Sequence, residues 1–246
     1  MIFEGRARGL SDVRTKSTDT DVATEYDRAS EAFIVSELQA ARPDDAIVGE
    51  EGADHSGTSG IRWYIDPIDG TTNYLYDIPA YAVSIAAADE HGTLVGVVAA
   101  PALGEVYTAI RGEGAFRNGQ AIRSNTVTKL ENALVGTGFG YDADRRARQG
   151  EVVARLLPRV RDLRRGGAAS VDLCYVACGR YDIYFEEGLS WWDMAAGELI
   201  ACEAGAVSTD FVGGPGRPGQ LIVSARGVAE AFRSVLVDAG APVMPV

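Results

Sequence analysis

Trp63-Tyr64-Ile65-Asp66-Pro67-Ile68-Asp69-Gly70-Thr71-Thr72-Asn73 is the stretch on which the interpretation of the whole chain depends. Its aromatic and branched start is typical of a buried strand. Pro67 has a fixed φ and pushes Asp66 into an extended conformation, so the chain leaves the strand along a defined path. Asp66 and Asp69 then stand three residues apart. Two carboxylates aimed at one point repel each other and are costly to desolvate unless a cation lies beside them.

The residues after the second aspartate favour an anion. Gly70 leaves room for a phosphate to approach the backbone, and a helix start is expected at Gly70-Thr71-Thr72, where free N–H groups favour negative charge. A cation site beside an anion site is what metal-assisted phosphoryl hydrolysis requires. The simpler alternative is a strand followed by a turn, because Asp-Pro and Asp-Gly are common turn dipeptides.

Composition limits the classes of partner. The chain has 246 residues, 46% of them hydrophobic, which suits one large or two small domains. Its 23 Lys and Arg against 35 Asp and Glu give a net charge of −12, which argues against a nucleic-acid or anionic-membrane partner. An anionic substrate then needs metal ions that invert the sign locally. No segment has the length and apolarity of a membrane span, and the N-terminus lacks the apolar region of a secretory signal.

The cysteines and histidines carry no chemistry in this interpretation. Cys174, Cys178 and Cys202 are predicted to be buried free thiols in a reducing cytoplasm, not a disulfide framework. His55 falls in a turn-rich loop at 53–60 and His91 in a hairpin turn, so neither is expected to act as a general base.

The first half is predicted to be one helix and a mostly antiparallel sheet. Residues 1–21 are polar and mixed, and Lys16 with the run Thr18-Asp19-Thr20-Asp21 is predicted to be a loop. Apolar residues at helical spacing predict a helix over 22–41, with Asp21 or Thr18 as its N-cap. Strands are expected at 46–49, 81–88, 93–100 and 105–110, followed by a tight turn at Asn118-Gly119.

The second half, from residue 124, alternates strands and helices. Strands are expected at 134–137, 181–185 and 221–224, and helices at 145–157, 170–178, 194–204 and 228–239. This alternation predicts a mixed, more parallel α/β half. The expected division is therefore 1–123, carrying most of the acidic site, and 124–246, carrying Asp193 and a substrate pocket.

The stretch 66–71 resembles the central motif of the inositol monophosphatase family, the magnesium-dependent, lithium-sensitive phosphatases. Three further pieces occur in the family's order: Gly49-Glu50-Glu51, Trp192-Asp193, and Lys16 leading to the segment 21–27. The likeness extends from Lys16 to the C-terminus. It implies the layered αβαβα sugar-phosphatase fold, an α+β or α/β architecture. It also implies a homodimer.

The resemblance also implies roles for individual residues. Two to three Mg²⁺ ions would be held by Glu50, Asp66, the carbonyl of Ile68, Asp69 and Asp193. The catalytic group would be Thr71, which orients a metal-bound water, Asp27 behind it, and Glu50. The phosphate and a polyol leaving group would meet Asp69, Gly70, Thr71, Ala169, Glu186 and Asp193. Glu51 and Lys16 are carried over more weakly, and the paired tryptophans before Asp193 either wall the site or pack in the core.

Several alternatives stay open at the level of sequence. The chain has no Cys-x5-Arg loop and no Asp-x-Asp-x-Thr pattern, so direct attack by a metal-activated water is favoured over a covalent route. The leading substrate is myo-inositol 1-phosphate; histidinol phosphate, a sugar bisphosphate or an adenosine bisphosphate would need the same chemistry. A non-enzymatic metal-binding module is the alternative of another class. Family members usually have a helix before the Lys16 region, so here that helix is shortened or translation starts earlier.

Overall fold

The first half of the chain builds an eight-stranded sheet. The computed structural model describes residues 1–10 and 12–242. In spatial order the strands are β10 (Gln120–Ala121), β9 (Ala115–Arg117), β8 (Glu105–Ile110), β7 (Gly92–Ala100), β6 (Ala82–Asp89), β5 (Arg62–Asp69), β3 (Ala46–Gly49) and β4 (Asp54–His55). Neighbouring strands are antiparallel except β3 and β5, which are parallel. The prediction of a mostly antiparallel first sheet is confirmed.

The second half builds a five-stranded mixed sheet. Its strands, in spatial order, are β12 (Asp162–Arg164), β11 (Leu134–Thr137), β13 (Ile183–Glu187), β15 (Gln220–Ser224) and β14 (Val207–Thr209). β11 is parallel to both β12 and β13, whereas β15 is antiparallel to β13 and β14. A separate two-stranded ribbon joins β1 (Val13–Thr15) to β2 (Val22–Thr24). The division of the chain at residue 123 stays a prediction.

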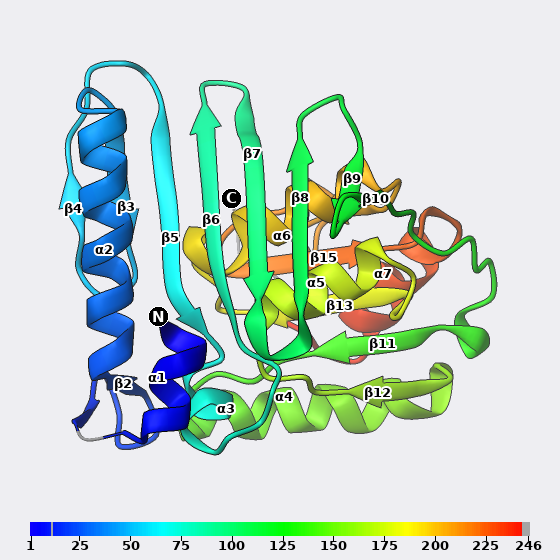
Figure 1. Ribbon diagram of the computed structural model, residues 1–246. Coiled ribbons are helices and arrows are strands. Elements are labelled where there is room, and N and C mark those ends of the chain that lie inside the picture. Colours follow the sequence, from blue (N-terminus) through cyan, green and yellow to red (C-terminus); the bar gives the residue numbers. More distant parts are fainter. Residues whose placement is uncertain (11, 243–246) are drawn as a thin grey trace.

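Helices form the other layers. They are α1 (Ile2–Arg8), α2 (Glu25–Ala41), α3 (Thr71–Leu75), α4 (Ala143–Leu156), α5 (Ala169–Ala177), α6 (Trp191–Glu203) and α7 (Ala229–Asp238). α2 covers one face of the first sheet beside β5, and α5 and α6 lie between the two sheets (Figure 1). Apolar residues of α4 and α7 pack on the outer face of the second sheet. The layers therefore run αβαβα, as the resemblance implies.

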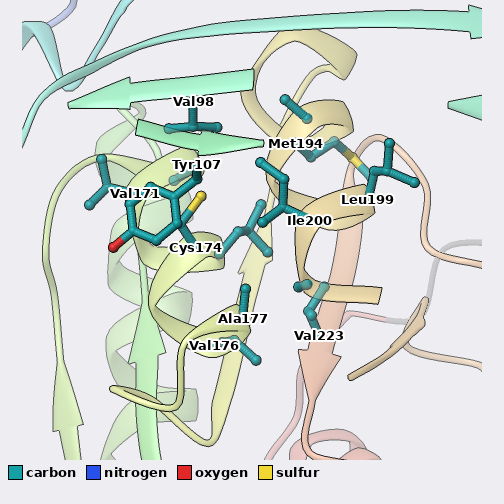
Figure 2. Packing of buried hydrophobic residues seen from close by; sticks show 14 of the residues in the cluster. Val98, Tyr107, Val171, Cys174, Val176, Ala177, Met194, Leu199, Ile200 and Val223 are labelled. Atoms are coloured by element: carbon teal, nitrogen blue, oxygen red, sulfur yellow. The ribbon is translucent and has the colours of Figure 1, made fainter. Parts of the chain in front are cut away.

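The central helical layer joins the two halves through one apolar core. Figure 2 shows Val98 and Tyr107 of the first sheet beside Cys174 of α5 and Ile200 of α6, all of them buried. Val223 of β15 belongs to the same cluster from the other side. Because these groups pack to near-crystalline density, the two sheets are held in a fixed relation, and residues at their edges can form one site.

The N-terminal region contains a short helix that the residue pattern alone does not predict. The segment before Lys16 forms α1 and β1, and Ile2 packs against Ile68, Tyr74 and Tyr81. The Tyr74 hydroxyl also donates to the Ile2 carbonyl at 2.8 Å. One buried isoleucine gives no periodic signal, so a helix held by tertiary contacts escapes pattern analysis. A seven-residue helix thus precedes Lys16 in the described chain.

The start of the long helix also needs correction. α2 begins at Glu25, not at residue 22, because residues 22–24 pair with β1. Its N-cap is Thr24, neither Asp21 nor Thr18. The Thr24 hydroxyl accepts from the Tyr26 N–H at 3.2 Å, and Asp27 closes a capping box with Thr24. The sequence contains several cap-competent residues in a row, and only the strand pairing decides among them.

Smaller differences concern loops, thiols and a helix start. The 53–60 loop contains the short strand β4, and α6 starts at Trp191, three residues before its predicted start. The cysteines are free thiols as predicted, but only Cys174 is buried; Cys178 is partly buried, and Cys202, in the last turn of α6, is exposed. Along the described residues, no helix has both the length and the apolarity needed to cross a bilayer.

The buried carboxyl group of Glu198 in α6 is expected to make the free energy of unfolding depend on pH. The Ser208 hydroxyl donates to its carboxylate at 2.5 Å. Burial raises the pKa of Glu198 to about 7, although the Ser208 hydrogen bond opposes the shift. The folded state therefore binds this proton more tightly than the unfolded state, so stability from this group is full below about pH 4.5 and falls as the pH rises through 7. We expect Glu198→Gln to be more stable than the parent by about 1–3 kcal/mol near pH 8 and not near pH 4.

Urea unfolding at both pH values measures this difference. Glu90→Gln is the control, because Glu90 is exposed in the β6–β7 turn. An equal effect of Glu198→Gln at both pH values would show that the buried charge does not set the stability.

Candidate active site

The central motif lies at the end of β5, where the strand pairing is irregular. The register with β6 shifts between Asp66 and Asp69, so both carboxylates leave the regular ladder. Asp66 is 1% exposed, and its Oδ1 accepts the Ile68 N–H at 3.1 Å. Pro67 tolerates this irregularity because it has no N–H to leave unpaired. The Pro67 carbonyl instead accepts the Ser30 hydroxyl of α2 at 3.2 Å.

Gly70 turns the chain from β5 into α3. Its φ is 87°, in the left-handed region. A methyl group there would lie 3.0 Å from Ala168 Cβ and 3.0 Å from the Ala80 carbonyl oxygen. The turn that follows the acidic motif is therefore pressed against the loop before α5, and the two halves of the chain meet at this point.

Gly70→Ala is expected to lower the free energy of unfolding by about 1–3 kcal/mol, from backbone strain plus the close contact. Gly92→Ala is the matched control, since Gly92 has φ 109° but a methyl group there would meet nothing within 4 Å. Chemical unfolding of both variants separates the cost of backbone strain from the cost of the close contact with Ala168. Equal losses in the two variants would assign no role to the contact with Ala168.

Thr71 and Asp27 form a buried pair that connects α3 to α2. The Thr71 hydroxyl lies 3.0 Å from Asp27 Oδ1 and 3.0 Å from the Ile68 carbonyl oxygen, both of which can accept its proton. Asp27 Oδ2 accepts the N–H of Thr24 at 2.8 Å and its hydroxyl at 2.5 Å. Asp27 is fully buried, and burial raises its pKa although these hydrogen bonds oppose the shift. The capping box of α2 thus also fixes the orientation of Asp27.

Asp69 and Asp193 bring the second half of the chain to the motif. Asp69 Oδ1 accepts the Ala169 N–H at 3.1 Å, and its Oδ2 accepts the N–H and hydroxyl of Ser170 at 2.6 and 2.5 Å. Asp193 lies in the first turn of α6, where its Oδ2 accepts the Ser190 N–H at 2.6 Å in a capping box. An acid fixed in this way at a helix start has a defined direction.

Glu50 approaches from the end of β3. Lys16 Nζ lies 2.9 Å from Glu50 Oε1 and also contacts the Glu51 carboxylate. Burial alone would lower the pKa of Lys16, but the two glutamates raise it above its usual value. Buried Glu31 of α2 accepts the N–H groups of Glu51 and Ala53 at 2.8 and 2.9 Å. Glu31 therefore holds the loop that presents Glu50.

The carboxylates influence each other electrostatically. Burial raises the pKa of Asp66 well above its usual range, and Glu50, Asp69 and Asp193 raise it further. Burial also raises the pKa of Asp193, with Asp69 and Glu50 adding to the shift. The pKa of Asp69 rises to about 6 through burial, although its hydrogen bonds to α5 oppose the change. Four acids from separate parts of the chain thus share one low-dielectric region.

This donor set fits a hard divalent cation. In the part of the chain that the structure describes, no three His, Cys, Asp or Glu side chains already stand in a metal-binding arrangement. Each of the four carboxylates is instead engaged by a neighbouring donor of the protein. Oxygen ligands of this kind match magnesium, and a cation would relieve the repulsion among them.

A cavity of about 170 Å³ opens beside Asp69 and Asp193. The segment 167–169 lines one wall, and Glu186 lines another. The Tyr184 hydroxyl donates to Glu186, and burial raises the pKa of Glu186 to about 7. Polar groups converging on a concave space are typical of small-molecule sites.

A model of the inositol monophosphatase family matches residues 2–240. The chain belongs to this family. It is 45% identical over 236 residues to inositol-1-monophosphatase SuhB of Mycobacterium tuberculosis, covering 91% of this chain and 81% of that protein. It is 42% identical over 196 residues to the Nus factor SuhB of Escherichia coli, covering 79% and 73%. The crystal structure of suhB from Bartonella henselae superposes with a TM-score of 0.89 at 34% identity, covering 96% and 92%.

As a member of the inositol monophosphatase family, the chain is a phosphoric monoester hydrolase. In the structure, Glu50, Asp69 and Asp193 lie close enough to Asp66 to raise its pKa. The Thr71 hydroxyl donates a hydrogen bond to Asp27. Their individual roles stay predictions. Neither histidine reaches the site, since His55 in β4 and His91 in the β6–β7 turn are both exposed.

Several residues around the site are not predicted from the sequence. They are Ser170 and Glu31, which hold Asp69 and the Glu50 loop, and Tyr141, Arg145 and Arg165, which line the cavity. Trp191 stacks on Tyr64 with ring centroids 5.6 Å apart and stays 38% exposed, so it is partly a surface residue. Only the Arg164-Arg165-Gly166-Gly167 run offered a signal, because basic and glycine residues before a helix favour an anion.

Proposed function

We propose that this chain hydrolyses a small phosphate monoester with magnesium-activated water, and that myo-inositol 1-phosphate is the leading substrate. The observation that supports it best is the buried Thr71–Asp27 pair beside four mutually repelling carboxylates. A purely structural metal site would need the acids but not a hydroxyl held between a carboxylate and a carbonyl.

The protein residues have definite tasks in this proposal. Glu50, Asp66, the Ile68 carbonyl, Asp69 and Asp193 would hold two to three Mg²⁺ ions, which when bound would supply a water of lowered pKa and positive charge for the phosphoryl oxygens. The Thr71 hydroxyl has a single proton, which it donates in a hydrogen bond to Asp27 or to the Ile68 carbonyl. Its oxygen therefore accepts a proton from the attacking water, and it passes its own to Asp27 Oδ1.

The substrate is held by backbone and cavity groups. The N–H groups of Gly70 and Thr71, at the start of α3, bind the phosphate. The polyol that leaves lies in the cavity, where Asp69 and Glu186 accept its hydroxyls and Ala169 lines the wall. A carboxylate that accepts a substrate hydroxyl rejects analogues that lack it, because the buried acceptor would then be unpaired.

Phosphate release from a substrate panel, with magnesium titration, tests this function. The panel contains myo-inositol 1-phosphate, histidinol phosphate, a sugar bisphosphate and an adenosine bisphosphate. We expect hydrolysis only with magnesium, the highest kcat/KM on a polyol phosphate, and inhibition by lithium. Activity on every member except inositol 1-phosphate would reject that substrate but keep the mechanism.

Absence of phosphate release would favour the non-enzymatic alternative. One relative bears the name Nus factor and not that of a phosphatase, so the purified chain has to be measured directly. A homodimer and a cytoplasmic location also remain proposals. Light scattering of the purified chain tests the former.

A further inference from the structure

Ser84 is a buried polar side chain on the apolar inner face of β6. It is 1% exposed, and Ala82 and Ala86, its neighbours on that face, belong to the core between the two sheets. A buried hydroxyl is costly unless it has a hydrogen-bond partner. The Ser84 hydroxyl has its partner in the second half of the chain, because it donates to the Trp192 carbonyl at 3.1 Å. This bond joins a strand of the first sheet to the first turn of α6.

Both ends of this hydrogen bond lie next to carboxylates of the acidic cluster. Asp66 and Ser84 are directly opposite each other in the β5–β6 ladder, and they form the last pair before the register shifts. The side chains of such a pair leave the same face of a sheet. Trp192 immediately precedes Asp193 in α6. Ser84 therefore connects the backbone segments that present Asp66 and Asp193.

A second contact holds the start of α6 against the first sheet. The helix lies on β6 and β7 (Figure 1). Gly96 of β7 faces Ala196, and a methyl group on Gly96 would lie 2.9 Å from the Ala196 carbonyl oxygen and 3.0 Å from its Cα. The glycine thus lets the helix backbone approach the strand closely. Ala196 lies one turn after Trp192, so both contacts fix the same part of α6.

The Asp193 carboxylate is fixed relative to its own helix. Its Oδ2 accepts the Ser190 N–H at 2.6 Å in a capping box. The position of α6 on the sheet therefore also sets the position of this carboxylate relative to Asp66. Burial raises the pKa of Asp66, and the charge of Asp193 raises it further, so the two acids lie close together.

We propose that Ser84 is a positioning residue for the divalent-cation site: its hydrogen bond to the Trp192 carbonyl sets the separation between Asp66 and Asp193. Ser84 acts through the backbone of α6 and not as a ligand. Metal ligands have to be held within about 0.5 Å of the geometry that binds the ion, so a small shift of the helix is sufficient to weaken binding. This inference rests on the proposed function, because it takes the clustered carboxylates as magnesium ligands.

Calorimetric titration with magnesium alone, in the absence of substrate, tests the proposal. Ser84→Ala removes the hydroxyl, and we expect magnesium to bind about fivefold more weakly, as the loss of one buried hydrogen bond next to a metal site predicts. Phosphate release should then need about fivefold more magnesium for half-saturation, while kcat at saturating magnesium stays within about twofold of the parent value. Urea unfolding in chelator measures the stability of each variant separately.

Ser224→Ala is the matched control. Ser224 is also 1% exposed and lies in a strand, but its hydroxyl has no hydrogen-bond partner among the described residues, and it does not line the site cavity. We expect its magnesium affinity to equal that of the parent. Gly96→Ala examines the same helix contact independently. The added methyl group pushes the start of α6 away from β7, so it should weaken magnesium binding at least as much as Ser84→Ala.

The possible outcomes separate this inference from the proposed function. Magnesium binding by Ser84→Ala within about twofold of the parent would overturn the inference and keep the proposed function, even if the variant unfolds at lower urea. Equal weakening in Ser84→Ala and Ser224→Ala would also overturn it, because the loss of any buried hydroxyl would then have the same effect. A parent protein that binds no magnesium would overturn the proposed function and this inference with it.

Discussion

Asp66→Asn is expected to lower kcat/KM for phosphate release by about 10³-fold or more while the protein stays folded. Asp66 is almost fully buried, and it lies close enough to Glu50, Asp69 and Asp193 for all three to raise its pKa. A carboxylate at the centre of such a cluster contributes most to cation binding. An amide keeps its shape but removes the charge, so the bound cation and the charge that it supplies are lost together.

A second aspartate gives the matched comparison. Asp45 is also buried, but hydrogen bonds from Arg42, Ser59 and Trp63 outweigh burial and lower its pKa to about 2. Asp45→Asn should therefore lower the free energy of unfolding by about 1–2 kcal/mol and leave kcat near the parent value. Asp66→Asn should not lower the free energy of unfolding in chelator, because it removes a repelling charge.

Phosphate release at saturating magnesium measures the activity of each variant. Calorimetric titration measures its magnesium binding, and urea unfolding measures its free energy of unfolding. Retention of more than a tenth of the parent activity by Asp66→Asn would remove Asp66 from the set of metal ligands. A large loss of activity in Asp45→Asn would show instead that any buried charge change disturbs the site.

The part of the site that one strand carries could be predicted from the sequence. Asp66, Asp69, Gly70 and Thr71 lie within six residues, so local backbone rules fix their mutual arrangement. The strands were predictable for the same reason, since their side-chain alternation is local. The layered order of sheets and helices needed the family resemblance in addition.

The contacts that hold this segment could not be predicted. Ser170 reaches Asp69 across 101 positions, and Glu31 reaches the loop after Glu50 from another helix. A single serine or glutamate leaves no periodic pattern in the sequence that would predict such a role. Its hydrogen-bond partner is determined by how two distant elements pack against each other. The N-cap at Thr24 could not be predicted for a related reason. Residues 22–24 are kept extended by pairing with β1, so the helix begins only after Thr24.

Thr71→Ala and Asp27→Asn are each expected to lower kcat by about 10²-fold, and the double variant by little more than either alone. The reason is the hydrogen bond of 3.0 Å that the Thr71 hydroxyl donates to Asp27 Oδ1. If the hydroxyl takes the proton of water only while it gives its own to Asp27, then removing either partner removes the whole function. Steady-state kinetics of the four proteins in this double-mutant cycle measure the coupling.

Thr71→Ser is the control for the hydroxyl itself, and it should keep most of the parent kcat. Asp27→Asn has a second consequence, because Asp27 Oδ2 also accepts the Thr24 N–H in the capping box of α2. We therefore expect it to lower the free energy of unfolding by about 1 kcal/mol, whereas Thr71→Ala leaves that box intact. Losses that multiply to about 10⁴-fold in the double variant would show that the two residues act independently. In that case the proton of the attacking water does not pass through Thr71 to Asp27.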